Sequence, residues 1–405
     1  MGTSLKVAVI GAGVSGLVAA RELLREGHRV VVYEKSNQLG GIWVYDPRIE
    51  SDPLGLDPNR EIVHSSLYAS LRTNLPRHLM SFSDYPFTDR VYKDPTNFPR
   101  HEEVLKFLND FANDFGLTEL IRFDTEVIRI ERVNSGDDDD DDDDEWVVES
   151  RTSEASGEEE FQAVVVCTGH YTEPIVANLP GIEKWPGKQV HSHNYRVPDP
   201  FQNQVVVMIG SGPSARDIYR EIASVAKQVH LSSRSPNVEV SKVDNIWQHL
   251  EIDHVYEDGT VAFQDGLRVH ADVIIHCTGY KYSFPFLRTN GTVSIEDNRV
   301  GPLYKHVFPP QLSPQLSFVG ICYQRLAMHG SCGRGWTCGV KEMRPPSSLN
   351  LADQIEQYLD MIADMAGVPM LAERTKEMQR HFFKFVVNCG WNVKQIRDEW
   401  DPNDV

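Results

Sequence analysis

The fold of this chain is decided by the stretch Lys6-Val7-Ala8-Val9-Ile10-Gly11-Ala12-Gly13-Val14-Ser15-Gly16. A mainly apolar segment, typical of a buried strand, runs into a glycine-rich turn, and a helical stretch follows from Leu17 to Arg25. A second apolar strand, Arg29–Tyr33, then ends on the acid Glu34. Strand, glycine turn, helix, strand and acid in this order predict a dinucleotide-binding unit rather than an ordinary glycine turn.

The residues of this turn have separate physical roles. Gly11 permits the tight turn, Gly13 lets the backbone approach a pyrophosphate, and Gly16 lets the helix pack closely on the strand. The pyrophosphate would accept hydrogen bonds from amides at the helix N-terminus, and Glu34 can accept them from ribose hydroxyls. The predicted contacts of the first dinucleotide are therefore Gly11, Gly13, Val14, Ser15, Gly16 and Glu34.

A second glycine pair follows shortly after this acid. Gly40 and Gly41 let the backbone pass close to a flat ligand, and Trp43 offers a large rigid wall beside it. Since the ring system of FAD reaches further from the pyrophosphate than that of NAD, it needs this additional covering. The alternative is an ordinary loop with a partly buried tryptophan.

A second fingerprint begins with the strand Val205–Ile209 and continues through Gly210-Ser211-Gly212-Pro213-Ser214-Ala215. Ala215 replaces the third glycine, which is a permitted variant. After the next strand the chain reads Ser232-Ser233-Arg234, so an arginine stands where the first unit has Glu34. A carboxylate would repel a 2′-phosphate, whereas a guanidinium can bind it bidentately. We therefore predict NADPH, rather than NADH, at this second turn with Ser233 and Arg234, and FAD at the first.

Two similar segments, Phe161–Gly169 and Ala271–Tyr280, each run from a buried strand into Cys-Thr-Gly and indicate two nucleotide-binding domains. We predict an α/β fold with two Rossmann-like dinucleotide-binding domains, the NADPH domain being inserted into the FAD domain. The predicted boundaries are residues 1–172 and 301–405 for the FAD domain and 173–300 for the NADPH domain. Helices are predicted over 100–115, 351–366 and 373–387.

Charge and cysteine content restrict the partners. The net charge of −19 makes nucleic acid or an anionic membrane a poor partner. The run Asp137–Asp144 cannot be buried, so it predicts a disordered loop between two strands, with weak divalent-ion binding as the alternative. The six cysteines form no even framework, and no leader or long apolar run is present. We expect a cytoplasmic protein without a membrane anchor.

The segment Tyr68–Pro76 leaves two interpretations open. Asn74 precedes Leu75-Pro76, where it could cap a turn, or it could present its amide to the reactive part of a cofactor. The residues alone do not decide between these roles.

Together these motifs resemble the flavin-containing monooxygenases, which are class B flavoprotein monooxygenases, and most closely their plant S-oxygenating, glucosinolate S-oxygenase-like branch. The matching segments are Gly11–Gly16, Gly40–Trp43, Tyr68–Asn74, Trp185–Arg196, Gly210–Ala215 and Cys277–Tyr280. The segment Trp185–Arg196 is similar to the identifying stretch of the family, with Trp185 in place of a phenylalanine.

The resemblance implies a monooxygenase that depends on NADPH and O₂. NADPH would reduce FAD, O₂ would add to the reduced ring as a C4a-hydroperoxide, and a small thioether or amine would take the distal oxygen. The protein would have to prevent the loss of H₂O₂ from this intermediate, which demands a dry pocket and a hydrogen-bond donor near the ring. The resemblance implies Asn74 as this donor, His191 as a residue that sets interdomain geometry, and no metal. Further implied cofactor contacts are Thr73, Thr278, Gly279 and Tyr280. A homodimer is compatible with the resemblance.

Three other activities share this fold. A disulfide reductase needs a cysteine pair near the flavin, and no cysteine precedes Cys167. Baeyer–Villiger oxygenation ranks second, because the identifying stretch of that group ends in Trp-Pro or Trp-Asp, whereas this one ends in Tyr195-Arg196. Auxin-type decarboxylating monooxygenation ranks third.

Residues 321–346 depart from the family pattern and have neither helical nor strand periodicity. A zinc site from Cys322, His329, Cys332 and Cys338 is conceivable, but the spacing is not a recognised one. We hypothesise an altered reading frame or splice in this segment. A leaky flavin pocket would then make the protein an uncoupled NADPH oxidase or an inactive FAD-binding homologue.

Overall fold

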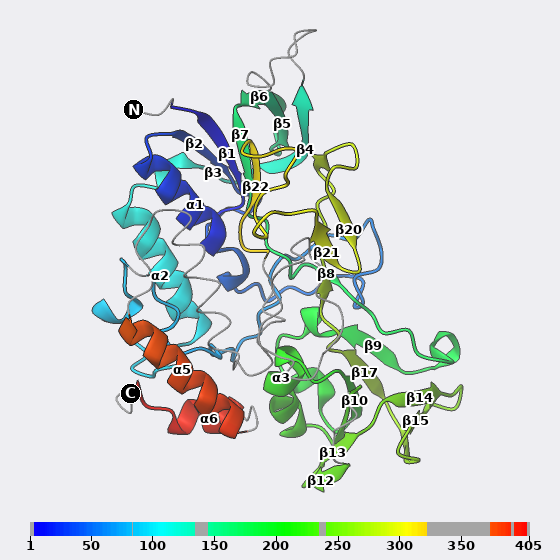
Figure 1. Ribbon diagram of the computed structural model, residues 1–405. Coiled ribbons are helices and arrows are strands. Elements are labelled where there is room, and N and C mark those ends of the chain that lie inside the picture. The colour runs from blue at the N-terminus through cyan, green and yellow to red at the C-terminus, as the bar shows by residue number, and fades with distance from the viewer. Residues whose placement is uncertain are drawn as a thin grey trace. The chain divides into compact units, whose positions relative to one another are not determined.

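The computed structural model describes residues 4–82, 84–133, 145–234, 240–321, 373–389 and 393–402. The chain forms two compact units (Figure 1). The first unit comprises Met1–Trp43, Arg72–Gly169 and Tyr282–Val405, and the second comprises Val44–Leu71 and His170–Lys281. Each unit is built on its own largely parallel sheet, so the predicted α/β class with two Rossmann-like domains is confirmed.

The boundaries between the two compact units differ from the predicted domain boundaries. Val44–Leu71, expected in the first domain, belongs to the second unit, where Arg60 donates a hydrogen bond to Glu173. Residues 282–300, expected in the second domain, belong to the first unit, where strand β19 (Leu287–Arg288) pairs with strand β4 (Glu126–Val133).

The central sheet of the first unit has the strand order β22-β7-β1-β2-β3, with all neighbours parallel (Figure 1). Its bounds are β1 Lys6–Ile10, β2 Arg29–Tyr33, β3 Ile121–Arg122, β7 Ala163–Val166 and β22 Leu316–Phe318. Alternate residues of β1 serve different faces, as expected of a buried parallel strand. Val7 and Val9 pack in one cluster with helices α1 (Val14–Arg25) and α2 (His101–Asp114). Ala8 and Ile10 pack in another, with Trp146 and Phe161.

That second cluster lies against a four-stranded sheet of order β19-β4-β5-β6, in which β5 is Glu145–Arg151 and β6 is Ser156–Phe161. The predicted acidic loop between β4 and β5 lies outside the described residues. A hairpin is formed by β20 (Ser294–Glu296) and β21 (Arg299–Gly301). Helices α5 (Glu373–Asn388) and α6 (Val393–Glu399) pack around Phe98, and α2 and α5 confirm two predicted helices. The helix predicted over 351–366 lies outside the described residues.

The second unit has a six-stranded sheet of order β12-β13-β11-β10-β17-β9, in which only the edge strand β12 is antiparallel. Its bounds are β9 Lys188–His191, β10 Val205–Ile209, β11 Gln228–Ser232, β12 Ser241–Val243, β13 Ile246–His249 and β17 Val273–His276. Helix α3 (Pro213–Ala223) packs through Ile218 and Ile222 on Val206 and Met208 of β10. Val207 instead packs with residues of the three-stranded sheet.

That three-stranded sheet comprises β14 (Ile252–Val255), β15 (Thr260–Phe263) and β16 (Arg268–His270), and β8 (Glu173–Pro174) pairs with β18 (Tyr280–Lys281). Short 3₁₀ helices are η1 Gly41–Trp43, η2 Phe87–Asp89, η3 Thr118–Leu120, η5 Ile182–Lys184, η6 Ser192–Asn194 and η7 Asp199–Phe201.

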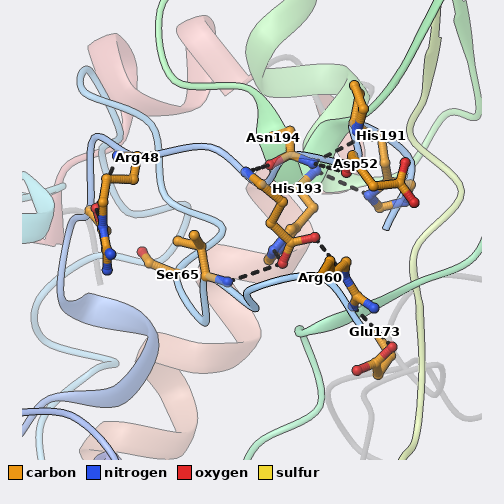
Figure 2. A network of polar contacts seen from close by, with 12 residues as sticks. Arg48, Asp52, Arg60, Ser65, Glu173, His191, His193 and Asn194 are labelled. Atoms are coloured by element: carbon orange, nitrogen blue, oxygen red, sulfur yellow. Dashed lines mark hydrogen bonds and ion pairs between the residues drawn. The ribbon is translucent and has the colours of Figure 1, made fainter. Parts of the chain in front are cut away.

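A buried polar network joins the two chain segments of the second unit (Figure 2). Arg60 donates from Nε to Glu50 Oε2 at 2.7 Å and from Nη2 to Glu173 Oε2 at 3.1 Å. His193 Nε2 lies 3.2 Å from Glu50 Oε1, and Asn194 Oδ1 accepts the Glu50 N–H at 2.9 Å. The side chain of Glu50 is 0% exposed, so its charge depends on these partners.

The ionisation of Glu50 follows from the same contacts. Burial alone would raise the pKa of Glu50, but hydrogen bonds from His193 and Arg60 bring this pKa below its ordinary value. A carboxyl with a lowered folded-state pKa contributes stability above its unfolded pKa and loses it as the pH falls through the folded one. The network is therefore intact at neutral pH and weakens only in acid.

We predict that Arg60→Met lowers the free energy of unfolding by about 3–5 kcal/mol, because it leaves a buried carboxylate without its cation. Arg48→Met is the matched control, since the Arg48 side chain is 65% exposed and pairs with Asp46 and Glu61 on the same segment. Differential scanning calorimetry measures both variants. Equal melting temperatures for the two would contradict the assignment of the network as a stabilising element.

Candidate functional site

The first glycine turn follows β1, whose neighbours β2 and β7 lie on either side of it. Gly11 has a φ of +104°, and its N–H donates to Tyr33 O at 2.8 Å. A Cβ on Gly11 would lie 2.7 Å from the carbonyl oxygen of Cys167, which follows β7. Both the backbone angle and the close carbonyl therefore require glycine here.

Helix α1 starts immediately after this turn. A Cβ on Gly16 would lie 1.8 Å from Gly11 O, so the helix approaches the turn as closely as the sequence predicts. Val14 and Ser15 form the first turn of α1, where backbone N–H groups lack intrahelical partners. Gly13 precedes them, and an added Cβ there would meet only Gly41 Cα, at 3.5 Å.

The loop with the second glycine pair lies directly against this turn. Gly40 N–H donates to Ala12 O at 3.0 Å, and both Gly40 and Gly41 have positive φ angles, of +124° and +56°. A Cβ on Gly41 would approach Gly13 Cα to 3.0 Å. Trp43, at the end of η1, is partly buried against the first cluster. The structure thus brings the predicted glycines 13 and 41 into contact.

Glu34 directly follows β2 and is 7% exposed. Its Oε2 accepts the Ala12 N–H at 2.8 Å, and its Oε1 accepts the N–H of Ser36 at 2.9 Å. Oε1 also accepts the Ser36 hydroxyl at 2.5 Å. These bonds fix the carboxylate beside the glycine turn, and Oε2 keeps a lone pair for a further donor. The hydrogen bonds from Ala12 and Ser36 to Glu34 were not predicted from the sequence. Both residues lie within or next to the motifs, and this proximity could have indicated these bonds.

After β22 the chain passes beside the first glycine turn again. A Cβ on Gly320 would lie 2.1 Å from Ser15 Oγ, so this segment passes over the first turn of α1. Tyr282 O–H donates to Ile321 O at 2.5 Å. The segment predicted from the sequence to depart from the family pattern thus begins beside the first turn. Apart from Ile321, residues 321–346 and the conceivable zinc ligands Cys322, His329, Cys332 and Cys338 lie outside the described residues.

The second glycine turn follows β10 and repeats this geometry with one difference. Gly210 has a φ of +108°, its N–H donates to Ser232 O at 2.9 Å, and an added Cβ would lie 2.5 Å from Cys277 O. Ala215 is buried in the core, so here the helix tolerates a Cβ. Gly212 has no heavy atom within 4 Å of an added Cβ. Pro213 and Ser214 form the first turn of α3.

Polar residues after β11 gather at this second turn. Ser233 Oγ donates to Ser211 Oγ at 3.2 Å, and Arg234 is exposed directly after it. Ser211 and Ser233 are therefore brought together as the sequence requires, with a cation beside them and no acid in the position of Glu34.

Thr278, Gly279 and Tyr280 follow β17 in the second unit. Thr278 Oγ1 donates to Ile175 O, and Gly279 has a φ of +85°. The Tyr280 ring lies edge-on to the ring of His191, with centroids 5.2 Å apart. Burial raises the pKa of the Tyr280 hydroxyl well above its ordinary value, so it stays protonated.

His191 is fully buried, and its Nδ1 accepts the His193 N–H at 3.0 Å. Burial, followed by the nearby rings of His193 and His276, lowers the pKa of His191 to about 3. A ring that is neutral at physiological pH suits the predicted positional role better than acid–base chemistry.

Thr73 and Asn74 lie in the first unit. Thr73 N–H donates to Pro99 O at 3.0 Å, and its buried Oγ1 has no hydrogen-bond partner among the described residues. Asn74 is exposed. Its side chain is thus accessible to a ligand, as either interpretation of this residue allows.

Redox thiols and metal ligands can be considered only for the described part of the chain. Burial raises the pKa of Cys277 to about 12 and that of Cys167 further, so both thiols stay protonated. Within the described ranges no group of three His, Cys, Asp or Glu residues could hold a metal ion. No helix in those ranges is long and apolar enough to cross a membrane.

Comparison with known proteins agrees with this geometry. Residues 4–251 and 240–338 match the family described as flavin-binding monooxygenase-like. The chain is 47% identical to "Flavin-containing monooxygenase FMO GS-OX4" of Arabidopsis thaliana, over 99% of the chain and 92% of the relative. It is 55% identical to "Flavin-containing monooxygenase FMO GS-OX-like 7" of the same plant, again over 99% and 92%.

Solved structures give the same result. The S-allyl-L-cysteine S-oxygenase from Allium sativum has a TM-score of 0.85 and 41% identity, covering 99% of this chain and 97% of that one. Tmm from a Pelagibacter strain, at 24% identity and a TM-score of 0.76, shares the fold. The predicted family resemblance is confirmed.

We predict that Gly16→Ala lowers the melting temperature and the flavin content of the purified protein. The new methyl group would overlap Gly11 O, and overpacking of this kind costs about 1–3 kcal/mol or more. Gly157→Ala, on exposed strand β6 with no atom near its added Cβ, is the control. The ratio of flavin to protein absorbance measures cofactor content, and an unchanged ratio in Gly16→Ala would refute the close contact.

Proposed function

The chain belongs to the flavin-binding monooxygenase-like family, and we propose that it uses NADPH and O₂ to oxygenate the sulfur of a small thioether or the nitrogen of a small amine. Members of this family are enzymes that use FAD and NADPH, in agreement with the cofactors predicted from the sequence. One observation carries the assignment of the two sites: beside the two equivalent glycine turns, β2 is followed by the acid Glu34 and β11 by the cation Arg234.

The first turn fits FAD. The close approaches of Gly11, Gly13 and Gly41 leave backbone rather than side chains around the N-terminus of α1, where a pyrophosphate would be bound. Glu34, fixed by the Ala12 N–H, would accept a ribose hydroxyl. The residues proposed to hold FAD are Gly11, Gly13, Val14, Ser15, Gly16, Glu34, Gly40, Gly41, Trp43, Thr73 and Asn74.

The second turn fits NADPH. Space is open around Gly212 at the N-terminus of α3, as a pyrophosphate would need. The exposed guanidinium of Arg234, with the hydroxyls of Ser211 and Ser233 beside it, would bind the 2′-phosphate. The residues proposed to hold NADPH are Gly210, Ser211, Gly212, Pro213, Ser214, Ala215, Ser233, Arg234, Thr278, Gly279 and Tyr280.

FAD, when bound and reduced, supplies the activation of O₂ and the transfer of one oxygen atom. The balanced reaction consumes thioether, O₂, NADPH and H⁺ and yields sulfoxide, NADP⁺ and water. A thioether is already a good nucleophile, so this chain need not activate it. Asn74, exposed in the loop after Thr73, would donate a hydrogen bond from its amide near the flavin ring. Sulfur is favoured because the S-oxygenase from Allium sativum is 41% identical.

One observation also favours a second function, an uncoupled NADPH oxidase that releases H₂O₂. The alignment with GS-OX4 spans 439 residues, whereas this chain has 405, so the relative carries residues that this chain lacks. Loss of covering residues would admit water to the flavin.

We predict that the purified holoenzyme consumes NADPH faster when a thioether such as an S-alkyl cysteine is present. Nearly all of the NADPH oxidised should appear as sulfoxide. NADPH absorbance, a peroxidase-coupled H₂O₂ assay and product chromatography measure the three quantities. Stoichiometric H₂O₂ without sulfoxide would reject the oxygenase in favour of the oxidase, and a protein without bound flavin would reject both.

We predict that Arg234→Ala lowers the ratio of kcat/KM for NADPH to that for NADH by about 10- to 100-fold, because a hydrogen bond to a charged group contributes about 1.5–3 kcal/mol. The value for NADH should change little, since NADH lacks the 2′-phosphate. Arg268→Ala, also exposed in the second unit, is the control. An equal loss with both coenzymes would show that Arg234 does not bind this phosphate.

A further inference from the structure

The C-terminal helix α6 contacts the loop that presents Asn74. Arg397 of α6 donates from Nε to Thr73 O at 3.2 Å and from Nη2 to Arg72 O at 2.6 Å. These are the carbonyls of the two residues that precede Asn74 in the chain. One guanidinium therefore fixes two consecutive peptide groups of this loop.

The other side of the loop is held by a different segment. Thr73 N–H donates to Pro99 O at 3.0 Å, and Arg77 N–H donates to Asn97 O at 2.8 Å. Arg72 Nη1 donates to Phe98 O at 3.0 Å. The segment 97–99 thus accepts hydrogen bonds from the loop, while Arg397 donates hydrogen bonds to the loop carbonyls at positions 72 and 73. Together these contacts restrict the backbone at Asn74.

The docking of α6 does not depend on Arg397. Ile396 and Trp400, each about 5% exposed or less, pack in an apolar cluster with Phe98 and Phe382. The rings of Trp400 and Phe382 meet edge to face with centroids 5.4 Å apart. Since this cluster anchors the helix, the loss of the Arg397 side chain should leave α6 in place while it releases the loop carbonyls.

We propose that Arg397 is a positioning residue that holds Asn74 in the geometry needed for coupled oxygenation. The proposal rests on the proposed function, in which Asn74 donates to the flavin ring. A displacement of about 1 Å at such a donor can lower the rate of a step about 100-fold, whereas binding of the distant parts of the cofactor is unaffected. The C-terminal helix would then act on the reaction without touching the cofactor.

The test compares four variants as full-length holoenzymes: Arg397→Met, Arg397→Lys, Asn74→Asp and Arg397→Met with Asn74→Asp. The measured quantity is the fraction of oxidised NADPH that appears as H₂O₂ with a saturating thioether. We expect this fraction to rise at least threefold in Arg397→Met and Asn74→Asp, and in Arg397→Met the flavin content and the KM for NADPH should stay unchanged. Arg397→Lys, which keeps the charge but can donate from only one nitrogen, should lie between Arg397→Met and the native chain.

The double variant shows whether Arg397 acts through Asn74. If it does, the double variant should be no more uncoupled than Asn74→Asp alone, because the two changes affect one interaction. Additive uncoupling would overturn the proposal. Arg380→Met is the control, since Arg380 lies on α5 and forms an ion pair with the exposed acid Glu373. It should match the native chain.

The remaining outcomes separate the two proposals. If Asn74→Asp is as well coupled as the native chain, the assigned role of Asn74 is wrong, and the role of Arg397 falls with it. If Asn74→Asp is uncoupled but Arg397→Met is not, only the inference about Arg397 is wrong. Loss of flavin and of thermal stability in both Arg397→Met and Arg397→Lys would show that Arg397 supports the fold rather than the reaction.

Discussion

The first unit depends on one close backbone contact, between the start of helix α1 and the turn that follows β1. A Cβ at Gly16 would lie 1.8 Å from Gly11 O, and one at Gly11 would lie 2.7 Å from Cys167 O. The turn is thus enclosed by its own helix on one side and by the end of β7 on the other. Because no side chain fits, the N-terminus of α1 stays open to a phosphate, and Glu34 reaches the Ala12 N–H at 2.8 Å. The same constraint that packs the helix on the sheet therefore also forms the surface proposed to bind FAD.

The second unit has only one of these two close approaches, the one at the first glycine of the turn. Gly210 has the same positive φ, and its added Cβ would lie 2.5 Å from Cys277 O, but Ala215 occupies the position of Gly16. The structure explains why a Cys-Thr-Gly segment occurs twice in the sequence. In each unit the strand beside the central one, β7 or β17, supplies the cysteine carbonyl that faces the first glycine of the turn. The cysteines themselves are buried protonated thiols, so their backbone rather than their sulfur serves the site.

The sequence allowed the prediction of what is encoded within about forty consecutive residues: both glycine turns, their flanking strands and helices, and the opposite charges at Glu34 and Arg234. It did not allow the prediction of contacts between distant residues. Glu50 meets His193 across 143 positions, and such contacts place Val44–Leu71 in the second unit rather than in the predicted first domain. Arg397 meets Thr73 across 324 positions. A lone arginine in an amphipathic helix has no local pattern that distinguishes it from an exposed cation, because its role is defined only by carbonyls that the fold brings to it.

The hypothesis of an altered reading frame in residues 321–346 can be compared with the contacts formed before and after this segment. Before it, β22 pairs with β7, and Ile321 O accepts the Tyr282 hydroxyl. After it, Met378, Phe382 and Val386 of α5 lie on one face of the helix and pack with Phe98. A frame-shifted stretch would produce such a spaced apolar face, and the two hydrogen bonds of Arg397, only by coincidence. These contacts favour the native frame from Glu373 onward and are compatible with an alteration within residues 321–346. The two fingerprints and the loop of Asn74 all lie outside that interval, so the proposed contacts to the two cofactors do not depend on it.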